Sequence, residues 1–262
     1  MNLDIYTSEM SKSVWDKAFF MDKIPGAKCV IDFGCADGAM IHFLAPLFPD
    51  ITFVGYDIST KLIDRARKTT PYKANTVFFD GHQIMGYRYI IQFIKDKKFK
   101  PEEICINFSS VLHEVFSSTT DGQRVIKHLI DELAPRYITI RDMYFHGENN
   151  VLSYYYVREI LNGFNVDDEK IEEFEDEFGS ICSKKNLHHF LMKYQWRNNG
   201  WDDEMAENYF SWDIKEFMKL IGSYTVAFNA FYMLPYYREQ WFEHELYPLD
   251  ADTHAQFILR RW

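Results

Sequence analysis

The chain has 262 residues, 47% of them hydrophobic and 18% aromatic, and a formal net charge of −10 at pH 7. This length and apolar fraction are enough for a large core within one domain. The negative charge argues against duplex nucleic acid as a partner, because it offers no attraction to a phosphate backbone.

Cysteine usage and hydropathy favour a cytoplasmic protein. The four cysteines form no Cys-x-x-Cys pair, which favours a reducing compartment and no disulfide framework. No run approaches 18 apolar residues, and no basic segment precedes an apolar run near the N-terminus. Neither a membrane span nor a secretion signal is therefore expected.

The chain begins with a segment, residues 8–24, whose apolar side chains recur at helical spacing. This spacing predicts a helix. We expect residues 1–26 to form a helical cap beside the first strand.

The stretch from Cys29 to Ala39 combines a short apolar strand with a glycine turn and the start of a helix. Gly34 and Gly38 allow the sharp turn, and such a turn brings backbone N–H groups close to a ligand. Asp32 and Asp37 add carboxylates, which accept hydrogen bonds from an ammonium or hydroxyl group and repel a phosphate. The stretch therefore predicts a nucleotide pocket that does not bind pyrophosphate.

Two further apolar runs, residues 51–57 and 76–80, each end on an acid. In a doubly wound sheet, Asp57 at the end of the second strand lies where it accepts hydrogen bonds from ribose hydroxyls. Asp80 would then lie near the exocyclic amine of adenine. Helical patterns at 39–48, 59–67, 87–96 and 121–133 alternate with these strands and with further strands at 104–108 and 137–143. The alternation predicts a parallel sheet covered by helices on both faces.

The end of the chain departs from this alternation. A helix at 213–221 precedes two strands, 224–231 and 254–261, and no helix is predicted between the strands. Residues 144–212 form an α-rich insertion after the fifth strand. Within it, the acidic segment 167–178 predicts an amphipathic helix with a solvated acidic face.

Basic and aromatic residues interleave in the next part of the insertion: Lys184, Lys185, His188, His189, Lys193, Tyr194, Trp196, Arg197 and Trp201. Such a pattern is typical of side chains that stack on bases and pair with phosphates. Aromatic packing on a neighbouring core produces the same pattern, so both interpretations stay open. Adjacent histidines on a helix do not easily face one ion, and we expect no metal site.

The glycine stretch Val30 to Gly38, the acids Asp57 and Asp80, and the segment 107–114 together resemble class I S-adenosylmethionine-dependent methyltransferases. The order and spacing of these pieces match over residues 27–143. Ala36 stands where the family has its middle glycine. The resemblance implies a doubly wound α/β fold with a mostly parallel seven-stranded sheet and an antiparallel last strand.

The resemblance also implies the site. S-adenosylmethionine would be bound by Asp32, Gly34, Cys35, Ala36, Gly38, Asp57, Ile58, Asp80, Gly81, Asn107 and Ser109. The resemblance allows the N-terminal cap to close over the cofactor with Tyr6, Trp15 and Lys17. The alternative is a helix that only covers the sheet. The insertion 144–212 would form a lid on the substrate side.

Methyl transfer requires alignment of donor and acceptor and, for a hydroxyl acceptor, removal of a proton. His113 after the fourth strand is the candidate base because imidazole titrates near neutral pH. Glu114 would orient it or act itself. The alternative for His113 is that it caps the next helix or lines the pocket.

Three residues at or beyond the end of the fifth strand, Arg141, Tyr144 and His146, are candidates for substrate contacts. A buried pair between Arg141 and Asp142 would produce the same sequence pattern, so the function of Arg141 stays open.

These features predict a methyltransferase acting on a small-molecule or nucleotide acceptor. A non-catalytic S-adenosylmethionine-binding module and an RNA methyltransferase that uses the basic aromatic insertion stay open as alternatives. An NAD-dependent oxidoreductase is disfavoured by Asp32, Ala36 and the helix-strand-strand ending.

Overall fold

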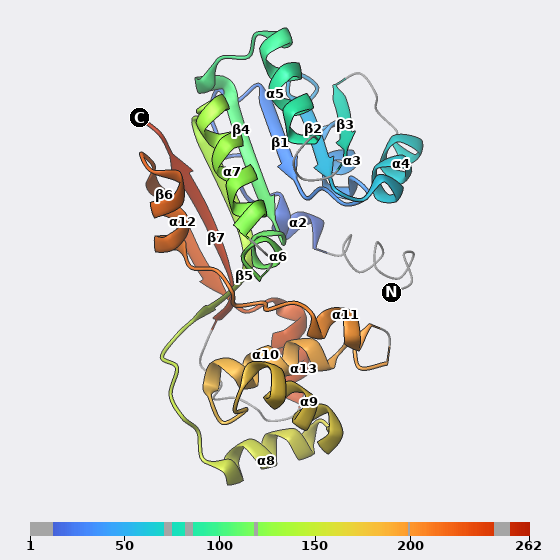
Figure 1. The fold of residues 1–262 in the computed structure, drawn as a ribbon, viewed down its shortest axis with the longest axis vertical. Coiled ribbons are helices and arrows are strands. Elements are labelled where there is room, and N and C mark those ends of the chain that lie inside the picture. Colours follow the sequence, from blue (N-terminus) through green and yellow to red (C-terminus); the bar gives the residue numbers. More distant parts are fainter. Residues whose placement is uncertain (1–12, 71–74, 82–85, 118–119, 199, 244–251) are drawn as a thin grey trace. The chain divides into compact units, whose positions relative to one another are not determined.

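The computed structural model describes residues 13–70, 75–81, 86–117, 120–198, 200–243 and 252–262 (Figure 1). The chain divides into two compact units. Among the described residues, those within 13–142, 212–230 and 256–262 form the sheet unit, and those within 143–211 and 231–255 form the helical unit. No helix in the described ranges is both long enough and apolar enough to cross a membrane. The helical unit includes the predicted insertion together with 231–255, which the sequence did not group with it.

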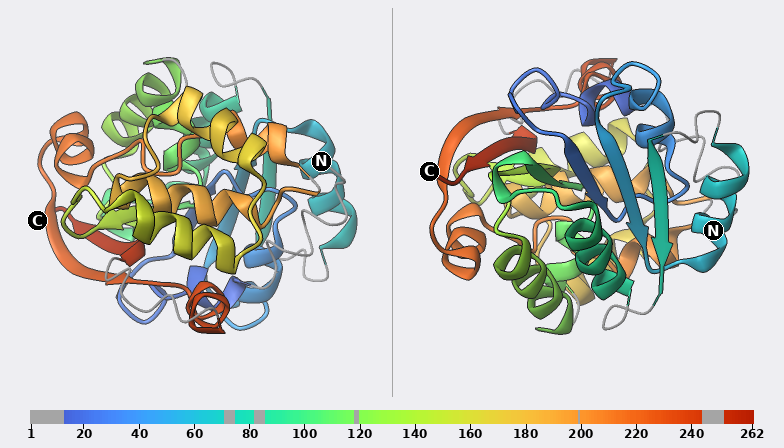
Figure 2. Two further views of the ribbon diagram at one scale, coloured as in Figure 1. Left: turned by 90° about the horizontal axis from the view of Figure 1, so that it is seen from below. Right: turned by 90° about the horizontal axis from the view of Figure 1, so that it is seen from above.

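The sheet has seven strands in the order β3-β2-β1-β4-β5-β7-β6, and only the last strand, β7, is antiparallel. This confirms the predicted fold class. Both β1 and β4 are buried along their whole length, as expected for parallel strands covered on both faces. The right-hand view in Figure 2 shows β1, β2 and β3 side by side. The strands are β1 (Cys29–Phe33), β2 (Thr52–Asp57), β3 (Thr76–Asp80), β4 (Ile104–Ser109), β5 (Tyr137–His146), β6 (Thr225–Tyr232) and β7 (Asp252–Arg260).

Helices of the sheet unit flank the strands. Ser59 caps α4 as predicted, because its Oγ accepts a hydrogen bond from the N–H of Leu62 at 3.4 Å. The helix after the glycine loop ends earlier than predicted, and the chain continues in turns. The helices are α2 (Val14–Lys17), α3 (Ala39–Leu44), α4 (Thr60–Thr69), α5 (Gly86–Lys97), the 3₁₀ turn η1 (Pro101–Glu103), α6 (Leu112–Ser117), α7 (Thr120–Leu133) and α12 (Ile214–Ile221).

The continuous helix predicted for residues 8–24 is wrong in its described part, and Tyr6 lies outside the described residues. Only Val14–Lys17 is helical, and the chain then follows turns closed by hydrogen bonds such as Lys23 N–H to the Phe20 carbonyl, at 2.9 Å. Phe20 is fully buried, and its neighbour Phe19 packs against the same core. Adjacent residues of an α-helix point about 100° apart, so turns allow both rings to reach one core.

The helical unit has its own apolar core. Its helices are α8 (Tyr154–Gly163), α9 (Asp168–Phe178), α10 (Lys184–Tyr194), α11 (Trp201–Met205) and α13 (Pro235–Glu243). The acidic segment forms α9 with Ile171 and Phe174 buried, which confirms the amphipathic helix. In α10, the side chains of His188, His189 and Lys193 are buried, so the packing interpretation describes them.

Helix α13 corrects the prediction that no helix separates the last two strands. Its Tyr237 and Trp241, four residues apart, are both buried in the core of the helical unit. Pro235 at the first helical position fits a helix start because its missing N–H would have no partner there. The short segment offered little amphipathic pattern from which to predict it.

Candidate functional site

The glycine loop joins β1 to α3 in a conformation that its residues require. Gly34 and Gly38 have φ of +81° and +77°, and a Cβ on Gly34 would lie 2.6 Å from Val111 Cγ2. The N–H groups of Gly34 and Cys35 both donate to the Tyr56 carbonyl, at 2.8 and 2.9 Å. These contacts tie the loop to β2, the strand that ends on Asp57.

Ala36 also has a positive φ, +48°, in the left-handed region that favours glycine. Ala36→Gly is expected to raise the free energy of unfolding by up to about 1 kcal/mol, because it relieves this backbone strain and only part of the gain is lost to chain entropy. Chemical denaturation measures the change. Gly34→Ala makes the reverse substitution at another loop position with positive φ, and it is expected to lower the free energy of unfolding. An Ala36→Gly variant as unstable as Gly34→Ala would contradict the argument.

Asp57 lies at the end of β2 and faces the loop. Its Oδ2 accepts from the Ala36 N–H at 2.9 Å, and its Oδ1 accepts from the Ser59 N–H at 2.8 Å. Burial raises the pKa of this carboxyl, and the two backbone hydrogen bonds oppose that rise. Each carboxylate oxygen can accept a further hydrogen bond.

A pocket of about 380 Å³ opens beside Asp57. Its wall combines residues of the loop, of the ends of β1 and β2, and of helices α4, α6 and α7. Its lining is Phe33, Gly34, Ala36, Tyr56, Asp57, Ile58, Ser59, Leu62, Ser110, Val111, Glu114, Val115, Gly122 and Val125. Four predicted cofactor residues, Gly34, Ala36, Asp57 and Ile58, are brought together here. The lining from α7 had no sequence signal, because small and apolar side chains in a helix equally indicate packing.

A second, smaller cavity of about 30 Å³ also borders Gly34 and Ala36. Its remaining lining is Val14, Lys17, Asp32, Cys35, Asp37, Ala39, Met40 and Ser109. The predicted residues Asp32, Cys35 and Ser109 therefore line this cavity rather than the larger pocket. Gly38 lines neither; its role is in the turn.

Three other predicted cofactor residues have partners inside the protein. Asp80 pairs with Arg67 at 3.0 Å, and Gly81 accepts a hydrogen bond from the Tyr56 hydroxyl at 3.0 Å. The Asn107 amide donates to Asp32 at 2.8 Å, and its oxygen accepts from the Thr139 hydroxyl at 2.8 Å. None of the three is in the described lining of the two cavities.

His113 and Asp142 form a buried pair at the start of α6. The distance from His113 Nδ1 to Asp142 Oδ1 is 2.7 Å, and both side chains are almost fully buried. The other Asp142 oxygen accepts from the N–H groups of Val111 and Leu112, at 3.1 and 2.7 Å. Asp142 thus caps α6 and orients the imidazole.

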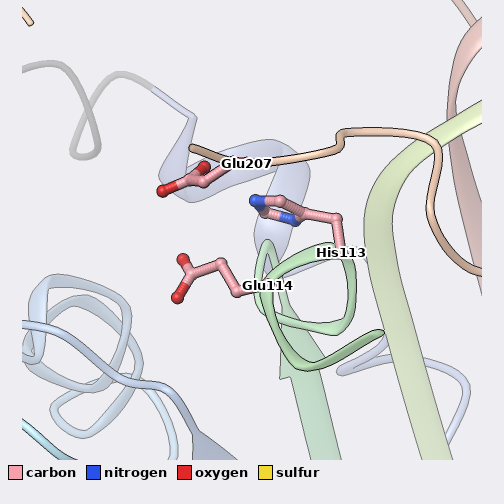
Figure 3. A group of neighbouring side chains, drawn as sticks. All are labelled: His113, Glu114 and Glu207. Atoms are coloured by element: carbon pink, nitrogen blue, oxygen red, sulfur yellow. The ribbon is translucent and has the colours of Figure 1, made fainter. Parts of the chain in front are cut away.

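Figure 3 shows His113 and Glu114 projecting from the start of α6. A His113 ring nitrogen and a Glu114 carboxylate oxygen lie within 4.8 Å of each other. Glu114 is exposed and lines the larger pocket, so the buried imidazole lies next to the pocket wall. Glu207, the third side chain drawn, belongs to the helical unit.

The candidate substrate residues fall in different units. Arg141 is buried in the sheet unit, where its Nε donates to Asp16 at 2.5 Å and its Nη1 donates to the Ser110 hydroxyl at 2.8 Å. It pairs with Asp16 rather than with Asp142. Tyr144 and His146 belong to the helical unit, where His146 stacks on Phe231 with ring centroids 3.8 Å apart.

Comparison with known proteins gives a fold. No family model matches the chain, and no curated protein matches it. Among solved structures, the methyltransferase domain of bacterial CtHen1-C is similar at 11% identity over 99% of both chains, with a TM-score of 0.50. An O-methyltransferase family protein from Burkholderia thailandensis is similar at 13% identity over 99% of this chain and 59% of its own, with a TM-score of 0.52. The chain therefore has the class I S-adenosylmethionine-dependent methyltransferase fold.

Proposed function

We propose that the chain binds S-adenosylmethionine in the sheet unit and transfers its methyl group to a small-molecule or nucleotide acceptor. The observation that carries this proposal is the pocket beside Asp57, in which a ribose-accepting carboxylate and a tight glycine loop share one wall. Asp57 accepts hydrogen bonds from the ribose hydroxyls. Ile58 has 58% of its surface exposed and covers the base.

The residues around the pocket suit this ligand. Its volume of about 380 Å³ is in the usual range for small-molecule sites, and its lining is largely apolar, as a purine ring requires. The smaller cavity shares Gly34 and Ala36 with it and contains the buried Ser109 hydroxyl, which has no hydrogen-bond partner among the described residues. A bound ligand would supply that partner.

The bound cofactor would supply an electrophilic methyl group on a sulfonium. When the acceptor is a hydroxyl group, the protein must supply a base that removes its proton. We assign that role to His113. Asp142 fixes the orientation of the ring through Nδ1, and Nε2 is the nitrogen to which we assign the proton transfer. Glu114 is the exposed polar group beside it and orients the acceptor. Arg141 supports this region by holding α2 through Asp16.

Isothermal titration with S-adenosylhomocysteine, S-adenosylmethionine and NADH tests the proposal. Both sulfur compounds are expected to bind, and Asp57→Ala is expected to weaken them about 10- to 100-fold, because hydrogen bonds to a charged group are lost. The matched control is Asp50→Ala, at an exposed acid in the turn before β2. Binding of NADH with neither sulfur compound bound would overturn the proposal.

Labelled methyl transfer to hydroxylated metabolites, nucleotides and RNA then separates the acceptors. A chain that binds the sulfur compounds and methylates none of these supports the non-catalytic alternative. The RNA alternative depends on the basic aromatic segment of the helical unit, where His188, His189 and Lys193 are buried and cannot contact bases or phosphates. A small acceptor is therefore favoured.

A further inference from the structure

A cluster of arginines lines a cleft at the edge of the sheet opposite to the glycine loop. The parallel strands β4 and β5 begin at this edge, and the antiparallel β7 ends there, close to the point marked C in Figure 1. The cleft has a volume of about 470 Å³, and its lining includes Glu102, Arg136, Arg260, Arg261 and Trp262. It lies within the sheet unit and shares no described lining residue with the two cavities beside the glycine loop.

Backbone hydrogen bonds hold the arginines of the cleft together. The Arg136 N–H donates to the Pro101 carbonyl at 2.9 Å, and the Arg261 N–H donates to the Arg136 carbonyl at 2.9 Å. These bonds tie the start of β5 to the turn before β4 and to the end of β7. The sheet therefore keeps three like charges near one another, and their mutual repulsion costs free energy.

The positive charges of the cleft are not balanced by carboxylates of the protein. Arg136 and Arg260 form no ion pair with a carboxylate of the described residues. The Arg260 guanidinium lies 3.9 Å from the centre of the Trp262 ring, and its buried Nε has no hydrogen-bond acceptor in the described part of the chain. Glu102 is the one acid of the described lining, against three arginines, although the whole chain has a net charge of −10. An anion in the cleft would reduce the repulsion among the arginines and supply an acceptor for their N–H groups.

The guanidinium groups and the indole of Trp262 narrow the class of anion. A guanidinium presents its N–H groups as a fork that matches the oxygens of a phosphate. The Trp262 Nε1–H donates to the Thr225 hydroxyl at 3.0 Å, which holds the ring in place while 85% of the residue stays exposed. Arg260 covers one face of the indole, and the other face can stack on a planar ring. The volume of the cleft is in the usual range for small-molecule sites.

We propose that this cleft binds a small phosphate monoester that carries a planar ring, as a nucleoside monophosphate does. Arg136 and Arg260 bind the phosphate, and the charge of Arg261 adds to the attraction. Trp262 stacks on the ring. Glu102 repels the phosphate and lowers the affinity of the site. The proposal does not depend on the proposed function, because the methyl donor is assigned to the opposite edge of the sheet.

Isothermal titration of the full chain tests the proposal with three ligands: uridine 5′-monophosphate, uridine, which lacks the phosphate, and ribose 5-phosphate, which lacks the ring. Uridine monophosphate is expected to bind about 10- to 100-fold more tightly than uridine and about 10-fold more tightly than ribose 5-phosphate. Arg136→Gln and Arg260→Gln are each expected to weaken both phosphates about 10-fold or more. Trp262→Leu is expected to remove the difference between the two phosphates, and Glu102→Gln to strengthen both a few fold.

The control variant is Arg88→Gln, at an exposed arginine of α5, which is expected to bind all three ligands as wild type does. Arg260→Lys, which keeps the charge without the fork, is expected to retain part of the affinity, and urea unfolding shows whether each variant is folded. Wild-type protein that binds uridine monophosphate no more tightly than uridine would overturn the inference. Loss of nucleotide binding in Asp57→Ala with wild-type binding in Arg136→Gln would also overturn it, because the nucleotide would then lie beside Asp57.

Discussion

Asp142→Asn is expected to lower methyl transfer about 10²- to 10⁴-fold, the usual contribution of a general base, while S-adenosylhomocysteine affinity stays within a few fold of wild type. The asparagine carbonyl can still accept from Val111 and Leu112, which keeps the cap of α6. Its NH₂ group, however, would donate to His113 Nδ1 where the carboxylate accepts. The imidazole would then carry its proton on Nε2. That nitrogen could no longer take a proton from the hydroxyl group that is to be methylated.

Asp142→Ala separates the structural role of this carboxylate from its catalytic role. It removes the cap as well as the histidine partner and leaves buried N–H groups unpaired, so a loss on the order of 3 kcal/mol in the free energy of unfolding is expected. Urea unfolding measures this loss, and ¹⁵N NMR of the imidazole reports which ring nitrogen is protonated. An asparagine variant with wild-type turnover, or with the same protonated nitrogen as wild type, would refute the assignment of His113 as base.

The strands around the site could be predicted because their sequence pattern is local. A short apolar run that ends on an acid marks both β2 and β3, and the glycine turn marks the end of β1. Parallel strands then bring these ends to one edge of the sheet. This reasoning places Asp57 beside the glycine loop, and in the structure its carboxylate accepts a hydrogen bond from the Ala36 N–H.

The partners of charged side chains could not be predicted, because they depend on register and pleat. Ser109 pairs in register with Arg141, so the next residues of both strands lie together at the sheet edge. Neighbouring strand residues point to opposite faces. Arg141 therefore reaches Asp16, 125 positions away, while Asp142 reaches His113. In the sequence Arg141 and Asp142 are only seen to be adjacent, and adjacency is equally consistent with a pair between them.

In the helical unit, the amino-acid composition of α10 does not decide between two interpretations. Histidine, lysine and aromatic residues in one helix suit either a nucleic-acid surface or a packed core, and only burial distinguishes them. The Lys193 ammonium donates to the carbonyls of Glu204 and Glu207 and lies 3.9 Å from the centre of the Tyr209 ring. The Lys193 charge is therefore bound by groups inside the helical unit, and the spacing of residues in the sequence does not reveal this.

His188 is expected to make the chain lose stability as pH falls below 6.5. Its side chain is fully buried against Trp241 and Phe145, and neither ring nitrogen has a hydrogen-bond partner among the described residues. Burial, together with the nearby charge of Lys184, lowers its pKa to about 3. The folded state therefore keeps the ring neutral where the unfolded chain, with a pKa near 6.5, takes up a proton.

The stability due to the neutral ring is complete above pH 6.5 and declines as pH falls toward 3, because only the unfolded chain takes up a proton in that range. Between pH 6.5 and 4 the loss amounts to about 3 kcal/mol, at 1.36 kcal/mol per pKa unit. Chemical denaturation of wild type and His188→Leu at both pH values isolates this contribution, because all other titrating groups are shared. The leucine variant is expected to equal or exceed wild type at pH 7, since it leaves no unpaired ring nitrogen.

The matched control is His128→Leu at an exposed histidine of α7, which is expected to keep the wild-type pH dependence. If His188→Leu lost as much stability between pH 6.5 and 4 as wild type, the imidazole would have to be protonated inside the fold. A buried imidazolium would need a partner that the aromatic rings around it do not supply, so the core of the helical unit would have to open to water at that position. The loss of stability between pH 6.5 and 4 in His188→Leu, compared with that in wild type and in His128→Leu, therefore decides the role of His188. It is either a packing residue or a group that water and ligands can reach.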